Sequence, residues 1–183
     1  MFFGDSRAVR WPVAAVFDRF EVVNRGVEAE TSAQAVLRFP AHVLPLHPDV
    51  LVIQVGVNDL KTIPLFPERK AEIIATTKEN IRYIIKQSTD LGARVVLTTI
   101  FPIGDFPLER RVFWSPEIGL ALQEVNDYLR SLSGARVNIF DTAAFLTLDG
   151  RANPKYYDDE LHLSESGYAM LNDELRNILN QND

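Results

Sequence analysis

The stretch Val50–Leu60, VLVIQVGVNDL, carries the strongest structural signal in the chain. Its first six residues are apolar almost throughout instead of alternating with polar ones, which is typical of a parallel strand buried on both faces. Gly56 ends the apolar run, and Asn58 and Asp59 follow it directly. This pattern predicts a buried central strand over residues 50–55 with polar side chains at its carboxyl end.

Similar runs on either side of this stretch predict four further strands, at residues 1–3, 20–24, 94–100 and 136–140. Helical segments are expected between them, at residues 6–18, 32–39, 67–92, 116–132 and 164–179. Strands that alternate with helices predict one doubly wound α/β domain over residues 1–183, with right-handed crossovers and a mostly parallel, five-stranded sheet. In such sheets ligands bind beyond the carboxyl ends of the strands.

The composition is that of an ordinary globular protein, with 183 residues, 46% hydrophobic residues and a net charge of −6. The chain has no basic cluster, so we expect no nucleic-acid partner, and no apolar run is long enough to span a bilayer. The absence of cysteine excludes thiolate nucleophiles and disulfides. No signal peptide is visible, so the compartment stays open. We expect a cytoplasmic protein if the chain begins natively at Met1, and a secreted or periplasmic one if a leader has been removed.

Polar residues with catalytic potential follow the predicted strands. Ser6 follows the first strand, Gly26 the second and Asn58 the third, while Asp159 and His162 lie between the fifth strand and the last helix. A serine hydroxyl needs a base to take its proton, and an imidazole needs a carboxylate to orient it. A tetrahedral oxyanion then needs hydrogen-bond donors. These residues therefore predict nucleophilic catalysis at one edge of the sheet.

Each residue alone also fits a structural role. Ser6 fits a helix cap, Gly26 a turn, and Asn58 an Asx turn closing the third strand. His162 alone fits a hydrogen-bonded structural histidine, and Asp158 competes with Asp159 for the carboxylate role. The structural reading weakens when the residues are taken together, because four separate coincidences would have to place catalytic residue types at the same edge.

The motifs resemble those of the SGNH hydrolases, or GDSL-type esterases and lipases. The matching residues are Gly4-Asp5-Ser6, Gly26, Gly56-Val57-Asn58-Asp59 and Asp159-Glu160-Leu161-His162. They occur in the family's order and cover nearly the whole chain. The resemblance implies a flavodoxin-like α/β/α sandwich with three layers.

The resemblance also implies the function and the roles of residues. Ser6 is expected as nucleophile, His162 as base and Asp159 as its partner. The amides of Ser6 and Gly26 and the side chain of Asn58 are expected to form the oxyanion hole. The implied activity is cleavage of a carboxylic ester, such as a short acyl ester, an acetylated sugar or a lipid ester, through an acyl-enzyme and without a cofactor or metal.

Two stretches depart from the family pattern, and the motifs do not identify the substrate. Large residues follow Ser6 where small or aliphatic ones are usual, and Ala29 and Glu30 stand where the second block often carries another glycine. We expect the substrate contacts to include Arg7, Trp11, Phe101, Phe113 and Trp114. The loop 101–116 is expected either to bind substrate or to be a plain surface connection.

Two alternatives to a hydrolase stay open. An acyltransferase would use the same site with an alcohol in place of water. A carbohydrate- or lipid-binding domain would keep the site residues without turnover. The oligomeric state is not predicted.

Overall fold

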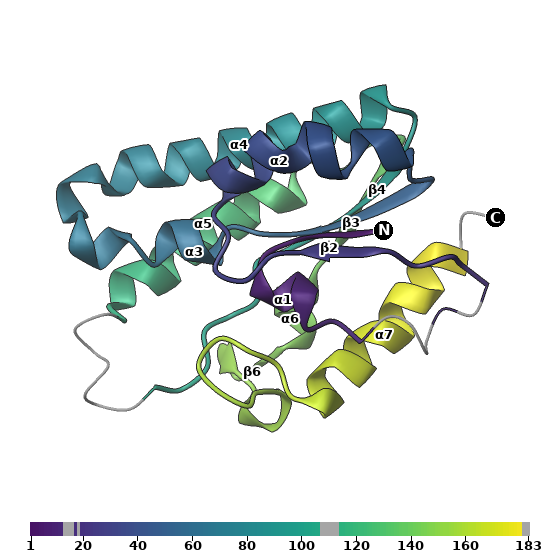
Figure 1. Cartoon of the computed structure of the whole chain (residues 1–183). Coiled ribbons are helices and arrows are strands. Elements are labelled where there is room, and N and C mark those ends of the chain that lie inside the picture. The colour runs from purple at the N-terminus through teal and green to yellow at the C-terminus, as the bar shows by residue number, and fades with distance from the viewer. Residues whose placement is uncertain (13–16, 18, 107–113, 181–183) are drawn as a thin grey trace.

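The computed structural model describes residues 1–12, 17, 19–106 and 114–180. Five parallel strands form its central sheet in the order β2-β1-β3-β4-β5. They are β1 (Phe2–Gly4), β2 (Asn24–Gly26), β3 (Val50–Gln54), β4 (Arg94–Thr98) and β5 (Val137–Phe140). The expected doubly wound α/β fold is confirmed, and β3 lies at the centre of the sheet (Figure 1).

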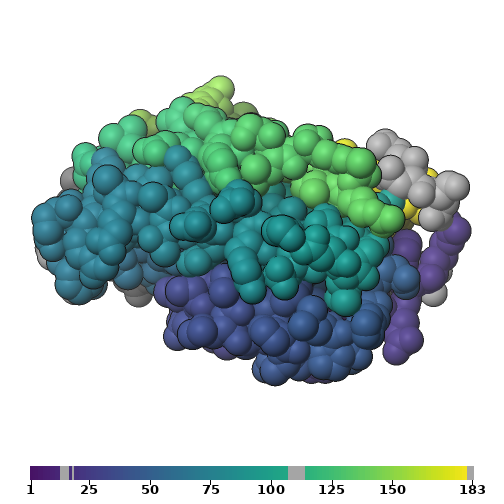
Figure 2. Space-filling view, turned by 90° about the horizontal axis from the view of Figure 1, so that it is seen from above, coloured from purple at the N-terminus to yellow at the C-terminus, as the bar shows by residue number. Residues whose placement is uncertain are grey.

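Helices cover both faces of the sheet. On one face lie α2 (Ser32–His42), α4 (Lys70–Asp90) and α5 (Pro116–Arg130), with α4 between the other two (Figures 1 and 2). The opposite face is covered by α7 (Glu165–Asn180), together with the short helices α1 (Ser6–Val9) and α6 (Thr142–Phe145). The remaining elements are α3 (Val57–Leu60), the 3₁₀ turns 44–46, 63–65, 67–69 and 154–156, and a hairpin of β6 (Thr147–Leu148) and β7 (Arg151–Ala152).

Alternate residues of each strand point to opposite faces, so the sheet separates two apolar clusters. Leu51 and Ile53 of β3 belong to the cluster under α2, α4 and α5. Val52, between them, belongs to the cluster under α7. Because both faces of β3 are buried, its sequence is apolar almost throughout rather than alternating.

The expected strand at 20–24 is wrong in position, because β2 begins only at Asn24. Its partner β1 has three residues, and the ladder pairs Phe2 with Asn24 and Gly4 with Gly26. Phe20 and Val22 instead pack against the cluster under α7. The short partner strand, and not the local β propensity, sets the length of β2.

The helix expected over 6–18 ends early in the structure, and residues 13–16 and 18 of that range lie outside the described residues. Helix α1 ends at Val9 with Arg10 as its C-cap, and Trp11 and Pro12 have no helical assignment. Pro12 fits this ending, because the residue before a proline is disfavoured in helical conformation. The other long helices lie within a few residues of their expected ranges.

Glycines at the ends of β1 and β3 turn the chain toward the carboxyl edge of the sheet. Gly4 has φ 149° and Gly56 has φ 123°, in the region of backbone space that favours glycine. A Cβ on Gly4 would lie 1.7 Å from the carbonyl oxygen of Gln54. Gly4 therefore lets the turn that carries Ser6 pass directly against β3.

Candidate active site

Ser6 and His162 meet at the carboxyl edge of the sheet, although 156 positions separate them in the sequence. Ser6 is the first residue of α1 and its side chain is largely buried. His162 Nε2 lies 3.1 Å from Ser6 Oγ, and His162 Nδ1 lies 2.7 Å from Asp159 Oδ2. The imidazole thus has the hydroxyl on one side and a carboxylate on the other.

Asp159 also shapes the loop that carries the histidine. Its Oδ1 accepts hydrogen bonds from the amides of Leu161 and His162, both at 2.7 Å. Burial alone would raise the pKa of Asp159, but these amides and the imidazole outweigh it and lower that pKa below its ordinary value. Asp159 is therefore a carboxylate at neutral pH. The competing Asp158 instead donates its amide to the carbonyl of His162, at 3.0 Å.

Asn58 lies in α3, directly after the central strand. Its side chain is mostly buried, and its Nδ2 donates to the carbonyl of Glu30 at 3.0 Å. Its Oδ1 accepts a hydrogen bond from Lys61 Nζ at 3.4 Å. The side-chain amide nitrogen of an asparagine has two protons, so one N–H of Asn58 is left to donate to a ligand in the crevice.

Asp59 joins this turn to the start of α2. Its two carboxylate oxygens accept from the amide of Ser32 at 2.8 Å and from Ser32 Oγ at 2.7 Å. Burial raises the pKa of Asp59, and the bonds from Ser32 oppose that change. The role of Asp59 is to hold the loop after β2 beside Asn58.

Gly26 does not offer the oxyanion donor that the sequence predicts. Its amide already donates to Asn24 Oδ1, at 2.8 Å. The Asn24 side chain in turn donates to the carbonyl of Ala8 at 2.7 Å. A Cβ on Gly26 would lie 2.4 Å from the amide nitrogen of Val9, so this glycine allows α1 to pack against β2. We therefore do not retain its amide in the oxyanion hole.

Ala29 is a site candidate that the sequence reasoning missed. It has φ 57°, which is uncommon for a residue with a Cβ. Its amide has no hydrogen-bond partner within the described residues, and the next residue, Glu30, bonds to Asn58. The departure from the family pattern at Ala29 and Glu30 was the available signal, because an alanine there occupies a conformation that favours glycine.

Most of the side chains that were expected to contact the substrate are enclosed by the protein. Arg7, Trp11 and Phe101 are each at most 2% exposed, and Trp11 Nε1 donates to Asn172 Oδ1 at 2.7 Å. Since these three side chains are enclosed by the protein, we do not retain them as substrate contacts. Trp114 is also buried, while Phe113 and the other residues of the range 107–113 lie outside the described residues.

Lys61 is a second residue that the sequence reasoning missed. It follows Asn58 by three positions, which places both side chains on the same side of a helical turn. Its Nζ lies 5.6 Å from the ring centre of Trp114. Burial lowers the pKa of Lys61, Arg7 lowers it further, and acidic groups including Glu160 and Asp159 oppose these effects. Lys61 thus lies within electrostatic reach of the loop that carries His162.

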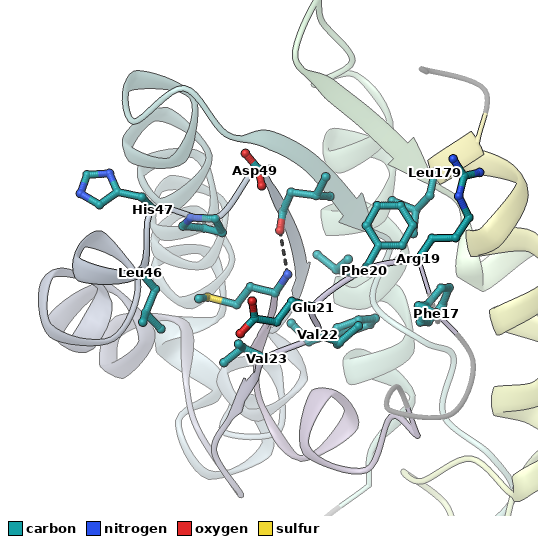
Figure 3. A pocket seen from close by; sticks show the side chains of 15 residues that line it. Phe17, Arg19, Phe20, Glu21, Val22, Val23, Leu46, His47, Asp49 and Leu179 are labelled. Atoms are coloured by element: carbon teal, nitrogen blue, oxygen red, sulfur yellow. Dashed lines mark hydrogen bonds between the residues drawn. The ribbon is translucent and has the colours of Figure 1, made fainter.

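A separate hollow of about 360 Å³ lies at the opposite edge of the sheet (Figure 3). Met1 and Val50 line it, at the amino ends of β1 and β3, together with Phe17, Phe20 and His47. The amine of Met1 donates there to the carbonyl of Val50 at 2.8 Å. Ser6 follows the carboxyl end of β1, so this hollow is not part of the Ser6 site.

No helix in the described ranges combines the length and apolar character that a bilayer crossing requires.

Solved structures with the same fold include several esterases and lipases. A GDSL-like lipase from Bacteroides thetaiotaomicron is 22% identical, with a TM-score of 0.81 over 98% of this chain and 86% of that one. A lipase/acylhydrolase from Enterococcus faecalis is 24% identical, with a TM-score of 0.74 over 98% and 94%. The acetyl xylan esterase AlAXEase is 19% identical, with a TM-score of 0.76 over 97% of both chains. At these identities the similarity establishes the fold.

Sequence comparison with curated proteins and with family models gives the classification. The uncharacterized lipoprotein YqeF of Bacillus subtilis (strain 168) is 32% identical over 84 residues, which are 45% of this chain. The match spans 33% of that relative's length. The model of the GDSL-like lipase/acylhydrolase family matches residues 2–170. This match covers all the motifs that suggested the resemblance, and the chain belongs to the GDSL-like lipase/acylhydrolase family, also known as the SGNH hydrolases.

Proposed function

We propose that this protein is a serine esterase that cleaves a carboxylic ester through an acyl-enzyme. The observation that carries the proposal is the imidazole of His162, which lies within hydrogen-bond distance of both Ser6 Oγ and the carboxylate of Asp159. A nucleophile, a base and an orienting carboxylate in series are what hydroxyl activation requires. Family membership supports the same chemistry.

In the first half-reaction Ser6 Oγ attacks the ester carbonyl while His162 Nε2 takes the hydroxyl proton. Asp159 accepts from Nδ1 and stabilises the imidazolium that forms. His162 then gives the proton to the leaving alkoxide, and the alcohol departs as the acyl group stays on Ser6. In the second half, water loses a proton to His162 and attacks the acyl carbonyl, and the acid leaves as His162 returns that proton to Ser6 Oγ.

The oxyanion is held by the free donor of Asn58 and by the amide of Ser6. That amide is the first in α1, so it has no carbonyl partner within the helix. A third donor is the amide of Ala29, which belongs to the loop that Asn58 contacts through Glu30. In this oxyanion hole the amide of Ala29 takes the place predicted for the amide of Gly26, which donates to Asn24 Oδ1 instead.

The test is hydrolysis of p-nitrophenyl esters of increasing chain length, with acetylated xylo-oligosaccharides alongside, since one similar structure is an acetyl xylan esterase. We expect Ser6→Ala to lower kcat at least about 10³-fold. Ser131→Ala removes an exposed hydroxyl at the end of α5 and should leave kcat unchanged. An organophosphonate should label Ser6 alone.

Equal rates for wild type and Ser6→Ala, or a label on another residue, would contradict the proposal. Product analysis with added alcohols distinguishes an acyltransferase from a hydrolase, because an acyltransferase would form a new ester in preference to the free acid. Binding of esters with neither turnover nor labelling would indicate a non-catalytic domain.

A further inference from the structure

Arg7 directly follows the proposed nucleophile, yet its side chain turns away from solvent. The side chain has no exposed surface. Its guanidinium donates to three main-chain carbonyls, those of Leu161 at 2.8 Å, Phe101 at 2.9 Å and Pro102 at 3.4 Å. Leu161 precedes His162 in the sequence, and Phe101 and Pro102 follow β4. One side chain thus joins the Ser6 turn to two other segments of the catalytic edge.

The charge of this guanidinium is an unusual feature of the interior. Burial lowers the pKa of Arg7, and among the groups that oppose this change are Tyr157 and Asp5. Asp5 Oδ1 accepts a hydrogen bond from the main-chain amide of Arg7, at 2.9 Å, while the guanidinium itself donates to neutral carbonyls. A buried cation costs folding free energy unless hydrogen bonds compensate it. An apolar side chain would fill the same volume without that cost.

The segments that Arg7 joins also bond to each other. Tyr157 Oη donates to the carbonyl of Pro102 at 2.8 Å, and the amide of Gly104 donates to the carbonyl of Glu160 at 3.0 Å. Both bonds link the segment after β4 to the loop that carries His162. The guanidinium of Arg7 bonds both of these segments to the Ser6 turn. Because its donors form a planar fork, it fixes the direction of these hydrogen bonds as well as their distance.

We infer that Arg7 is a positioning residue that holds the His162 loop at hydrogen-bond distance from Ser6. This inference rests on the proposed function, in which His162 takes the proton of Ser6. Arg7 touches no substrate in this role. It fixes the carbonyl of Leu161 and thereby the start of the His162 backbone. A misplacement of about 1 Å at such a base can cost about 10²-fold in rate.

Two substitutions at Arg7 and one nearby control test the inference. Arg7→Met fills the volume without donors, while Arg7→Lys keeps the charge but supplies a point donor in place of the fork. Arg10→Met removes a cation from the same turn, where Arg10 is exposed and lies 3.5 Å from Glu28. For Arg7→Met we expect kcat to fall about 10²-fold with KM within about twofold. Arg7→Lys should lie between wild type and Arg7→Met, and Arg10→Met should match wild type.

A readout that does not depend on turnover accompanies the kinetics. The proton between His162 Nδ1 and Asp159 should give a downfield NMR resonance in wild type and in Arg10→Met. We expect it to broaden or shift in Arg7→Met, because the imidazole then has no fixed position relative to Ser6. If wild type hydrolyses no ester, the proposed function fails while this resonance still tests the positioning role.

Folding and positioning can be separated by the lysine variant. If Arg7→Met does not fold, Arg7→Lys decides, with its thermal midpoint measured beside its kcat. A folded Arg7→Lys with reduced kcat and an altered resonance supports the inference. A wild-type kcat and an unchanged resonance in a folded Arg7 variant would overturn it, as would a loss confined to KM.

Discussion

The turns after β1 and β3 are built alike. Each begins with a glycine at positive φ, Gly4 or Gly56, and each leads into a helix of four residues. Each carries a polar side chain for the crevice, Ser6 or Asn58, next to an aspartate, of which Asp5 is fully buried and Asp59 partly buried. They lie side by side because β1 pairs with β3.

The two aspartates differ in how well they are bonded. Both oxygens of Asp59 accept from Ser32, at 2.8 and 2.7 Å. Asp5 accepts from the amide of Arg7 through Oδ1, but its buried Oδ2 has no partner in the described part of the chain. The turn after β3 is therefore completed by hydrogen bonds to the start of α2. The turn after β1 is completed differently: one oxygen of Asp5 lacks a partner within the described residues, and the buried guanidinium of Arg7 extends to a main-chain carbonyl of the histidine loop.

The largest difference between the turns should appear when each glycine is replaced by alanine. In Gly4→Ala the new Cβ meets the carbonyl oxygen of Gln54 at 1.7 Å, and the backbone cannot yield. We expect a loss of more than about 4 kcal/mol in the free energy of unfolding, measured with urea. In Gly56→Ala the nearest atom is the flexible Ile100 Cδ1 at 2.8 Å, and we expect a loss of about 1–3 kcal/mol.

Gly119 provides the matched control, because a Cβ there meets nothing within 4 Å and the residue lies in α5. Gly119→Ala should raise stability by about 0.5–1 kcal/mol. Equal losses for Gly4→Ala and Gly56→Ala would show that positive φ, and not the contact with Gln54, governs these positions.

Substitutions at two adjacent residues of the turn after β3, Asn58 and Asp59, should separate effects on catalysis from effects on stability. Asn58→Ala removes an oxyanion donor, so we expect kcat to fall about 10²–10³-fold, with a loss of about 0.5–1.5 kcal/mol of stability from the bond to the carbonyl of Glu30. Asp59→Asn places an amide beside the donors of Ser32, so we expect it to lose about 1–3 kcal/mol of stability. Its kcat per folded molecule should stay near that of wild type. An intact kcat in Asn58→Ala would remove Asn58 from the oxyanion hole.

The incomplete bonding of Asp5 should be visible as a pH dependence of stability. Burial raises the pKa of Asp5 to about 7, with Arg7 opposing this and with Asp59 and Glu30 adding to it. A raised carboxyl pKa contributes stability that is complete below the ordinary pKa and is lost as the pH rises through about 7. From pH 5 to pH 7 this contribution should fall by about 2 kcal/mol relative to Asp5→Asn, by urea unfolding. Parallel curves for the two proteins would contradict the shift.

The smallest effect on kcat is expected at Lys61, which ends the turn after β3 as the C-cap of α3. Lys61→Met removes the hydrogen bond to Asn58 Oδ1, whose length is 3.4 Å. A loss of about 0.5–1.5 kcal/mol in transition-state stabilisation corresponds to a decrease in kcat of about 2–10-fold. Lys86→Met on the exposed side of α4 is the control and should leave kcat unchanged. A larger loss than in Asn58→Ala would mean that Lys61 contacts the substrate itself.

The sequence predicted the central strands well because burial on both faces leaves an apolar run with clear ends. Residues 50–55 were expected and Val50–Gln54 is observed. Edge strand β2 was misplaced because pairing with a three-residue β1 sets its extent. Two of the four-residue helices, α3 and α6, were not predicted, because one turn of helix produces no periodic pattern, and α1 was predicted as the start of a longer helix.

The residues at the strand ends lie where the sequence predicted, since parallel strands bring their carboxyl ends to one edge. The substrate contacts did not follow from the sequence. Nothing in the pattern of Arg7 and Trp11 distinguishes a side chain that faces a ligand from one enclosed by α7 and the loop after β4. Such burial depends on contacts between distant segments, including the bond from Trp11 to Asn172.

The separation of 156 positions between Ser6 and His162 has a consequence for the order of folding. Contacts between the two ends of a chain close the longest loops and therefore tend to form late. The bond from Arg7 to Leu161 spans a similar distance, with 154 positions between the partners. Regain of ester hydrolysis during refolding should then lag behind regain of helical circular dichroism. Enzymatic activity would thus report the last step of assembly, when the tail of the chain closes on its beginning.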